Sequence, residues 1–146
     1  MKRKLFLLIC ATLLASAFFA GCAAKDAKDL DLTADDLMGV IGSGYNELKR
    51  SIGTLEDEID EMRGSKYSYK RTVFGGDANI SVVMDDTGDK VERITVYTDK
   101  ENIGRWRDEL GLKYGVGVND RWTVGKNRVS IIDSGKTAII SIERAA

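Results

Sequence analysis

The sequence contains no histidine and no proline, and its only cysteines are Cys10 and Cys22. Without histidine, the chain lacks the most common general base and the most common metal ligand in proteins. A Ser-His-Asp or Cys-His catalytic site is therefore excluded. Because proline is absent, we expect the 15 glycines to form most of the turns.

Other catalytic and metal-binding patterns are weak or missing. No Ser-x-x-Lys motif occurs, and the two Gly-x-Gly segments at 42–44 and 115–117 are too short for a phosphate-binding fingerprint. The segment 85–89 is acidic, but it lacks the alternate acidic spacing and distal glutamate of a calcium loop, so it predicts a hairpin turn. Acidic residues are too numerous to single out a glycosidase pair. We therefore expect no catalytic residues, no cofactor and no metal site.

The first 22 residues have the pattern of a bacterial export signal. Lys2-Arg3-Lys4 forms a positive start, and an apolar run of 15 residues extends from Leu5 to Phe19. The end of this segment, Phe19-Ala20-Gly21-Cys22, resembles the lipobox of bacterial lipoproteins, in which leucine is more usual at the position of Phe19. The resemblance implies cleavage between Gly21 and Cys22 and a diacylglyceryl thioether on the Cys22 sulfur.

Lipid on Cys22 predicts a membrane anchor. Each buried methylene contributes about 0.8 kcal/mol, so two or three acyl chains hold a protein on a bilayer where one chain does not. One alternative is an uncleaved transmembrane helix, although the apolar run is shorter than the roughly 20 residues needed to span. The other is a plain cleaved signal with an incidental cysteine. The expected location is the cell membrane or outer membrane, on the side of the periplasm or the cell exterior.

These boundaries predict a signal peptide at 1–21, a lipidated N-terminus and tether at 22–32, and a globular domain at 33–146. The mature chain has 19 basic and 23 acidic residues, a formal net charge of 19 − 23 = −4, which argues against binding nucleic acid. Acylation of Cys22 leaves the domain without a disulfide or a free thiol, so a hydrophobic core must stabilise it.

The segment 33–53 predicts two short helices. Thr33 and Asp36 have the spacing of a capping box, which satisfies backbone N–H groups at a helix start. The glycines of 42–44 interrupt the apolar helical stripe, and Gly53 ends it. Thr54 predicts the start of a third helix, whose acidic residues are typical of a solvated face.

From Tyr67 onward, apolar and polar residues alternate and predict an antiparallel meander. A second capping box at 98–101 predicts a helix that ends at Gly111. Three further strands follow. The expected strands lie near 67–73, 78–84, 94–96, 121–124, 129–132 and 138–142, and the expected buried helix face holds Ile103, Trp106 and Leu110.

This order predicts an α+β domain with helices packed on one face of an antiparallel sheet. Each half consists of a helix followed by three strands, so the chain either contains two duplicated units or repeats the same turn chemistry. The helix at 44–53 and the meander after it are similar to the unit of the beta-lactamase inhibitory protein and of small outer-membrane assembly lipoproteins. That family has Gly-x-Pro after the helix, whereas Thr54-Leu55-Glu56 follows Gly53 here. The resemblance implies that the sheet face or its loops bind another protein.

Aromatic side chains are the remaining candidates for function. Tyr114, Trp122 and Tyr97 lie on or beside strands, where such residues form interface hot spots but also ordinary sheet contacts. The segment 114–120 has two glycines and no regular period, which predicts a mobile binding edge. We therefore expect a membrane-anchored, non-enzymatic module that binds another envelope protein or assists envelope assembly. The alternative is a membrane-held inhibitor or sensor of a secreted enzyme or envelope ligand.

Overall fold

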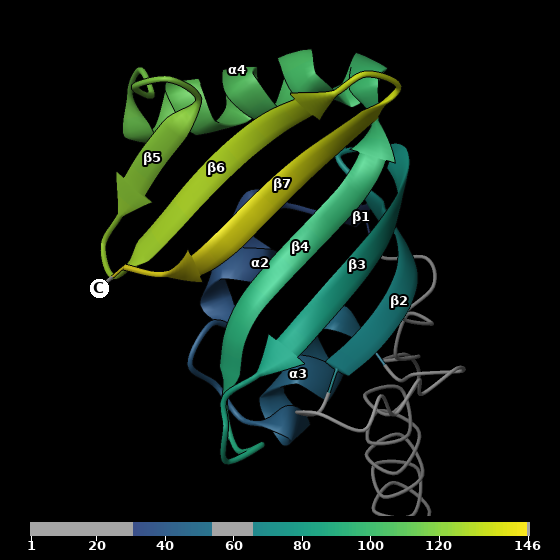
Figure 1. Cartoon of the computed structure of the whole chain (residues 1–146), viewed down its shortest axis with the longest axis vertical. Helices are drawn as coiled ribbons and strands as arrows, with labels where there is room; N and C mark the ends of the chain where they lie inside the picture. Colours follow the sequence, from purple (N-terminus) through teal and green to yellow (C-terminus); the bar gives the residue numbers. More distant parts are fainter. Residues whose placement is uncertain (1–30, 54–65, 146) are drawn as a thin grey trace, which may run out of the picture.

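The computed structural model describes residues 31–53 and 66–145. Within them, seven strands form one sheet in the order β1-β2-β3-β4-β7-β6-β5 (Figure 1). The elements are β1 Asp31–Leu32, α2 Ala34–Gly39, α3 Tyr45–Ile52, β2 Lys66–Val73, β3 Gly76–Met84, β4 Val91–Asp99, η3 Lys100–Asn102, α4 Ile103–Tyr114, β5 Arg121–Val124, β6 Asn127–Ser134 and β7 Thr137–Arg144.

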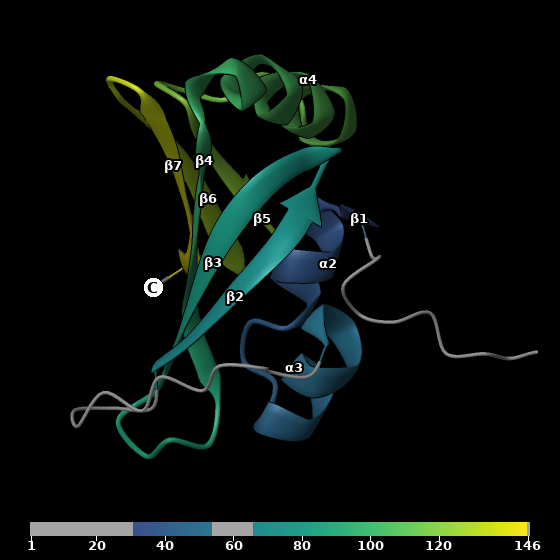
Figure 2. The same cartoon turned by 90° about the vertical axis from the view of Figure 1, so that its right-hand side faces the viewer.

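The prediction of helices packed on one face of an antiparallel sheet is wrong. The sheet is mixed, because β1 runs parallel to β2 while the other strand pairs are antiparallel. Strands hold more of the described residues than helices do, 47% against 28%, and the sheet curls beside a few short helices (Figure 2). Strand β1 has only two residues, so its sequence has no alternating pattern from which the strand could be predicted. Leu32, at the end of the predicted tether, is buried in this strand.

Two three-strand meanders meet at the centre of the sheet. Strands β2, β3 and β4 are neighbours in order, as are β5, β6 and β7. Their last strands, β4 and β7, pair antiparallel with a register that runs from Arg93 opposite Glu143 to Asp99 opposite Thr137. This arrangement places β1 and β5 at opposite edges of the sheet.

The hydrophobic core is one cluster that contains residues from the strands and from α2, α3 and α4. Side chains alternate between the two faces of a strand, so every second residue of β3, from Ala78 to Met84, is buried. Leu37 of α2, Leu48 of α3 and Trp106 of α4 are fully buried members of the same cluster. Figure 2 shows α2 and α3 beside β2 and β3, with α4 across one end of the strands.

The predicted capping box and bend of the first two helices are confirmed. The Thr33 N–H donates to Asp36 Oδ2 at 2.8 Å, and the Asp36 N–H donates to Thr33 Oγ1 at 3.3 Å. Helix α3 ends at Ile52, and Gly53 follows with a φ of 101°, a conformation that favours glycine. The predicted helix from Thr54 lies outside the described residues.

The start and end predicted for the next helix are wrong. Thr98 does not cap it, because its Oγ1 donates to the Asp77 carbonyl at 2.8 Å within the sheet. A 3-10 turn intervenes, and α4 begins at Ile103. The helix passes through Gly111 and ends at Tyr114, since interior helix positions accept glycine at a cost of only about 1 kcal/mol.

The buried face predicted for α4 is confirmed, with Ile103, Trp106 and Leu110 all in the core. The Trp106 ring meets Phe74 edge-on at a centroid distance of 4.8 Å, so α4 is packed on the turn between β2 and β3. Arg105 of α4 also donates a hydrogen bond to the Phe74 carbonyl. None of the helices in the described ranges has both the length and the apolar character required to cross a membrane.

Candidate functional site

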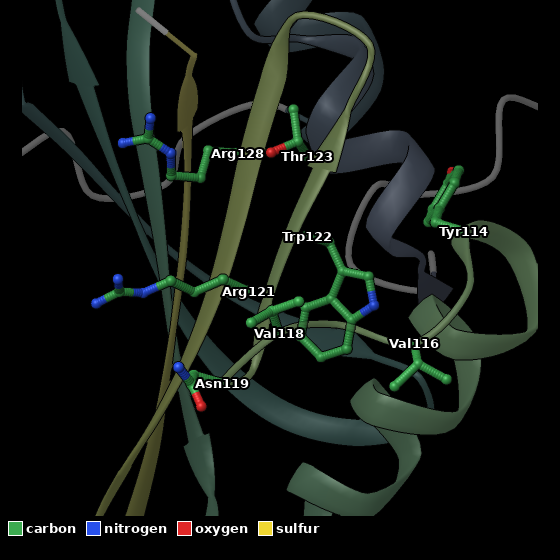
Figure 3. A pocket seen from close by; sticks show the side chains of 8 residues that line it. All are labelled: Tyr114, Val116, Val118, Asn119, Arg121, Trp122, Thr123 and Arg128. Carbon is green, nitrogen blue, oxygen red and sulfur yellow. The ribbon is translucent and has the colours of Figure 1, made fainter.

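The aromatic residues predicted to bind a partner lie on two different surfaces. Tyr114 and Trp122 line one pocket of about 480 Å³ beside β5 (Figure 3). Tyr97 lies on β4, is 41% exposed and does not line this pocket. The predicted lipidation site Cys22 and the cleavage position at Gly21 lie outside the described residues. The pocket is lined by Tyr114, Val116, Val118, Asn119, Arg121, Trp122, Thr123 and Arg128.

A short loop beside this pocket exposes large apolar side chains. Val116 is 97% exposed and Val118 is 73% exposed; both belong to residues 115–120, which we call the Val116 loop. Leu112, near the end of α4, is 84% exposed. Of the six exposed large hydrophobic residues in the described ranges, four lie between 112 and 118. Such a concentration of apolar surface on one segment is typical of an interaction site.

Trp122 holds the Val116 loop against β5. Its Nε1 donates a hydrogen bond to the Gly115 carbonyl at 2.9 Å, and its side chain is 7% exposed. The ring also covers Gly117, because a Cβ added to Gly117 would lie 2.6 Å from Trp122 Cζ2. Any larger residue at 117 would displace the ring or the loop.

A tight turn closes the other end of the loop. Val118 and Arg121 exchange two backbone hydrogen bonds, with N–O distances of 3.0 and 3.1 Å. Between them, Asn119 and Asp120 have φ values of 51° and 56°, as a type I′ turn requires. Asn and Asp tolerate this left-handed conformation better than other non-glycine residues.

The Asp120 carboxylate fastens this turn to α4. Arg107 Nε and Nη2 donate to its two oxygens at 2.8 and 2.6 Å. This paired geometry adds directional specificity to the charge attraction. The hydrogen bonds from Arg107 lower the pKa of Asp120 below its ordinary value.

Asp35 of α2 fixes the start of the loop. It accepts hydrogen bonds from the Tyr114 hydroxyl and from Lys113 Nζ, the latter at 2.6 Å. The hydrogen bond from Lys113 is the main cause of the lowered pKa of Asp35. The hydrogen bond to Asp35 raises the pKa of Tyr114 to about 12. The Val116 loop is therefore tied to the body of the domain at both ends.

The other side of the pocket is basic. Arg121 on β5 and Arg128 on β6 extend away from Trp122, towards the outer face of the sheet (Figure 3). Arg128 Nη1 lies 3.5 Å from Glu143 Oε1, an exposed pair of the kind that stabilises little. Arg121 forms no ion pair with any residue in the described ranges. The pocket thus joins an apolar loop to two arginines.

Tyr97 belongs to a separate apolar row on the outer face of the sheet. It is opposite Ile139 of β7, which is in turn opposite Ile132 of β6. Tyr97 and Ile132 are exposed, and Ile139 is half-buried. The sequence therefore predicted one residue of this row and two residues of the pocket, without indicating that they lie apart.

The acidic turn at 85–89 is the predicted hairpin turn. Asp85 Oδ1 accepts hydrogen bonds from Thr87 Oγ1 at 2.7 Å and from the Asp89 N–H at 3.0 Å. These bonds, led by the one from Thr87, lower the pKa of Asp85. Across residues 31–53 and 66–145, no group of three or more acidic or thiol side chains is placed to hold a metal ion.

The predicted binding segment 114–120 contains Val116 and Val118, but the sequence did not single out either valine and did not indicate Arg121 or Arg128. Single exposed valines in a loop have no periodic signal, and their role depends on Trp122, six residues after Val116 and four after Val118. In comparisons with known proteins, no family model, curated protein or solved structure matches this chain. The resemblances to lipoproteins and to the beta-lactamase inhibitory protein therefore stay predictions.

Proposed function

We propose that this chain is a bacterial lipoprotein whose domain binds another envelope protein without catalysing a reaction. The observation that supports this proposal is the exposure of Val116 and Val118 on a loop that the rest of the domain holds in place. Burying apolar surface in a complex gains about 25 cal/mol per Å². A loop that is already ordered loses little conformational entropy when it binds.

In this proposal, lipid on Cys22 holds the domain at the cell membrane or outer membrane, facing the periplasm or the cell exterior. Nucleic acid is not a partner, because the mature chain carries a formal net charge of −4. The domain acts as an assembly or adaptor module whose Val116 loop contacts the partner.

A second candidate function is inhibition or sensing of a secreted enzyme. The same geometry favours it, because protein inhibitors commonly present a rigid loop that changes shape little on binding. The two functions differ in the partner: an assembly module binds a resident envelope protein, whereas an inhibitor binds an enzyme and lowers its turnover.

Affinity capture from envelope extracts tests the proposal. The full chain should retain one stoichiometric protein, and the double substitution Val116→Asp and Val118→Asp should release it. Ile132→Asp is the matched control, because Ile132 is also an exposed apolar residue but lies on β6 outside the pocket. Equal capture by all three proteins would refute the site. Turnover of a glycan or peptide by the purified domain would refute the non-enzymatic function.

A further inference from the structure

We propose that the partner presents an extended segment with acidic residues at alternate positions, and that Arg121 and Arg128 bind their carboxylates. This inference rests on the proposed function and identifies the chemistry of the partner. In the complex, this segment of the partner lies on the outer face of β5 and β6, directly beside the Val116 loop. Both arginines line the same pocket as Val118 and Thr123, so the apolar and basic parts form one continuous surface.

The charge of this surface is opposite to that of the whole domain. On strands β7, β6 and β5, the outer face carries Arg128 opposite Glu143 and Arg121 opposite Ser130. Two arginines and one glutamate give 2 − 1 = +1, whereas the mature chain has a formal net charge of 19 − 23 = −4. A local basic surface on an acidic protein attracts and orients an acidic partner.

Arg121 is the arginine most available for a partner. It forms no ion pair within the described ranges, and it is exposed on the edge strand of the sheet. Arg128 makes only the long contact of 3.5 Å with Glu143, so a better placed carboxylate can replace that contact. Guanidinium groups bind carboxylates with two parallel hydrogen bonds, which gives this pair both affinity and direction.

The spacing of the two arginines indicates an extended ligand. Arg121 is opposite Ser130 and Arg128 is opposite Thr123, so the two arginines are diagonal neighbours on one face. Diagonal neighbours on antiparallel strands are separated by about 7–8 Å. Alternate residues of an extended chain lie about 7 Å apart and point to the same side. Two acidic residues separated by one position therefore match the two guanidinium groups.

The position of the anchor favours a protein over the lipid surface as the ligand. Strand β1 begins nine residues after Cys22, and nine residues span at most about 30 Å. The anchor therefore keeps the β1 edge within about 30 Å of the bilayer. Strand β5 lies at the opposite edge of the sheet from β1. The two strands are six places apart in the strand order, and neighbouring strands are about 4.8 Å apart. The arginines thus lie on the side of the sheet remote from the tether.

Photo-crosslinking in the envelope tests this proposal. A benzoylphenylalanine placed at Thr123 of the full chain lies in the pocket, directly opposite Arg128 and two residues from Arg121 on β5. The crosslinking yield should fall at least about tenfold when Arg121 and Arg128 are both replaced by Glu. It should fall less, by about two- to fivefold, when both are replaced by Lys, which keeps the charge but loses the paired hydrogen bonds. The crosslinked peptide should contain acidic residues at alternate positions.

Arg93→Glu is the matched control for the charge change. Arg93 lies on the same outer face but on β4, and it does not line the pocket, so the yield should not change. Far-UV circular dichroism of the Lys and Glu variants checks that both are folded.

The other possible results of the crosslinking experiment distinguish a wrong ligand from a wrong function. If Val116→Asp removes the crosslink and the charge reversal does not, the proposed function stands and the acidic ligand is wrong. A crosslinked peptide without acidic residues also refutes the acidic ligand. A crosslink to lipid refutes the choice of a protein ligand. If no protein is crosslinked in any background, both the inference and the proposed function fail.

Discussion

Trp122 is the residue on which the candidate site depends. Its indole N–H binds the Gly115 carbonyl and its ring covers Gly117, so a buried side chain determines the position of two exposed valines. The sequence identified Trp122 as an interface candidate, whereas the structure shows it 7% exposed with a positioning role. Trp122 was predictable as a functional residue because it is aromatic. Its positioning role became visible only from its contact with Gly117 in the structure.

Replacing Gly117 with Ala tests this contact. The new Cβ would overlap the Trp122 ring, and overpacking of this kind typically costs about 1–3 kcal/mol. We expect the free energy of unfolding to fall by this amount, measured by urea denaturation. Gly111→Ala is the matched control. Gly111 is in α4 with no atom close to an added Cβ, so alanine should raise stability by about 0.5–1 kcal/mol. A neutral Gly117→Ala would show that the ring does not constrain the loop.

The Tyr114 hydroxyl should titrate later than that of an ordinary tyrosine. Its pKa is raised to about 12 by the hydrogen bond to Asp35, so its contribution to stability is complete below pH 10 and is lost between pH 10 and about 12. Ultraviolet titration of the wild type minus Tyr114→Phe should show a midpoint near 12. In the Asp35→Asn background the midpoint should move towards 10. A wild-type midpoint at 10 would contradict the Tyr114–Asp35 contact.

Asp35 makes the stability of the domain depend on pH in the opposite direction, at low pH. Its pKa is lowered, chiefly by Lys113, so its contribution is present above the ordinary value of 3.8 and is lost as the pH falls below it. The wild type should therefore lose more stability than Asp35→Asn between pH 4 and pH 2, as measured by thermal melts. Parallel pH profiles of the two proteins would contradict this contact.

At the scale of elements, α4 is the support of the candidate site. Its buried face was predictable because Ile103, Trp106 and Leu110 repeat at helical spacing. Its start was not predictable, because Thr98 hydrogen-bonds within the sheet instead of capping the helix, and its end was not, because the helix continues through Gly111. Its last residues, from Lys113 on, contact α2 and lead into the Val116 loop. Damage to the packing of α4 should therefore affect both the fold and the site.

Trp106→Ala tests the packing of α4. Trp106 is fully buried and meets Phe74 edge-on, and truncation of such a residue costs about 3–5 kcal/mol. We expect a loss of this size in chemical denaturation. Leu112→Ala on the same helix is the control, because Leu112 is exposed and its truncation should change stability by less than about 0.5 kcal/mol. Equal effects of the two substitutions would refute the assigned face of α4.

At the scale of the whole molecule, the sequence predicted the strands better than the sheet they form. The alternation of β3 and the bounds of β5 were visible in the sequence. The parallel strand β1 was not, because a two-residue strand has no period, and its pairing with β2 crosses a long stretch of sequence. The strand order, which places β1 and β5 at opposite edges, was not predictable either. It depends on which strands pair with each other, and the pattern within one strand does not show this.

The proposed anchor is tested by Cys22→Ala. Lipid on Cys22 is the expected source of membrane attachment, so the substitution should move the protein out of the membrane fraction and abolish incorporation of labelled fatty acid. Ser16→Ala, in the apolar run of the signal, is the control and should leave both unchanged. Membrane retention of Cys22→Ala with intact labelling would refute the lipoprotein assignment.

The candidate site requires the Val116 loop to be an ordered surface that exposes its valines before any partner binds. The sequence, with two glycines and no period, predicted a mobile edge instead. Backbone ¹⁵N relaxation of the domain distinguishes the two. For an ordered loop, we expect order parameters near 0.85 for the amides of Val116, Gly117 and Val118, as in the neighbouring strands. Order parameters below about 0.6 for these three amides would contradict it.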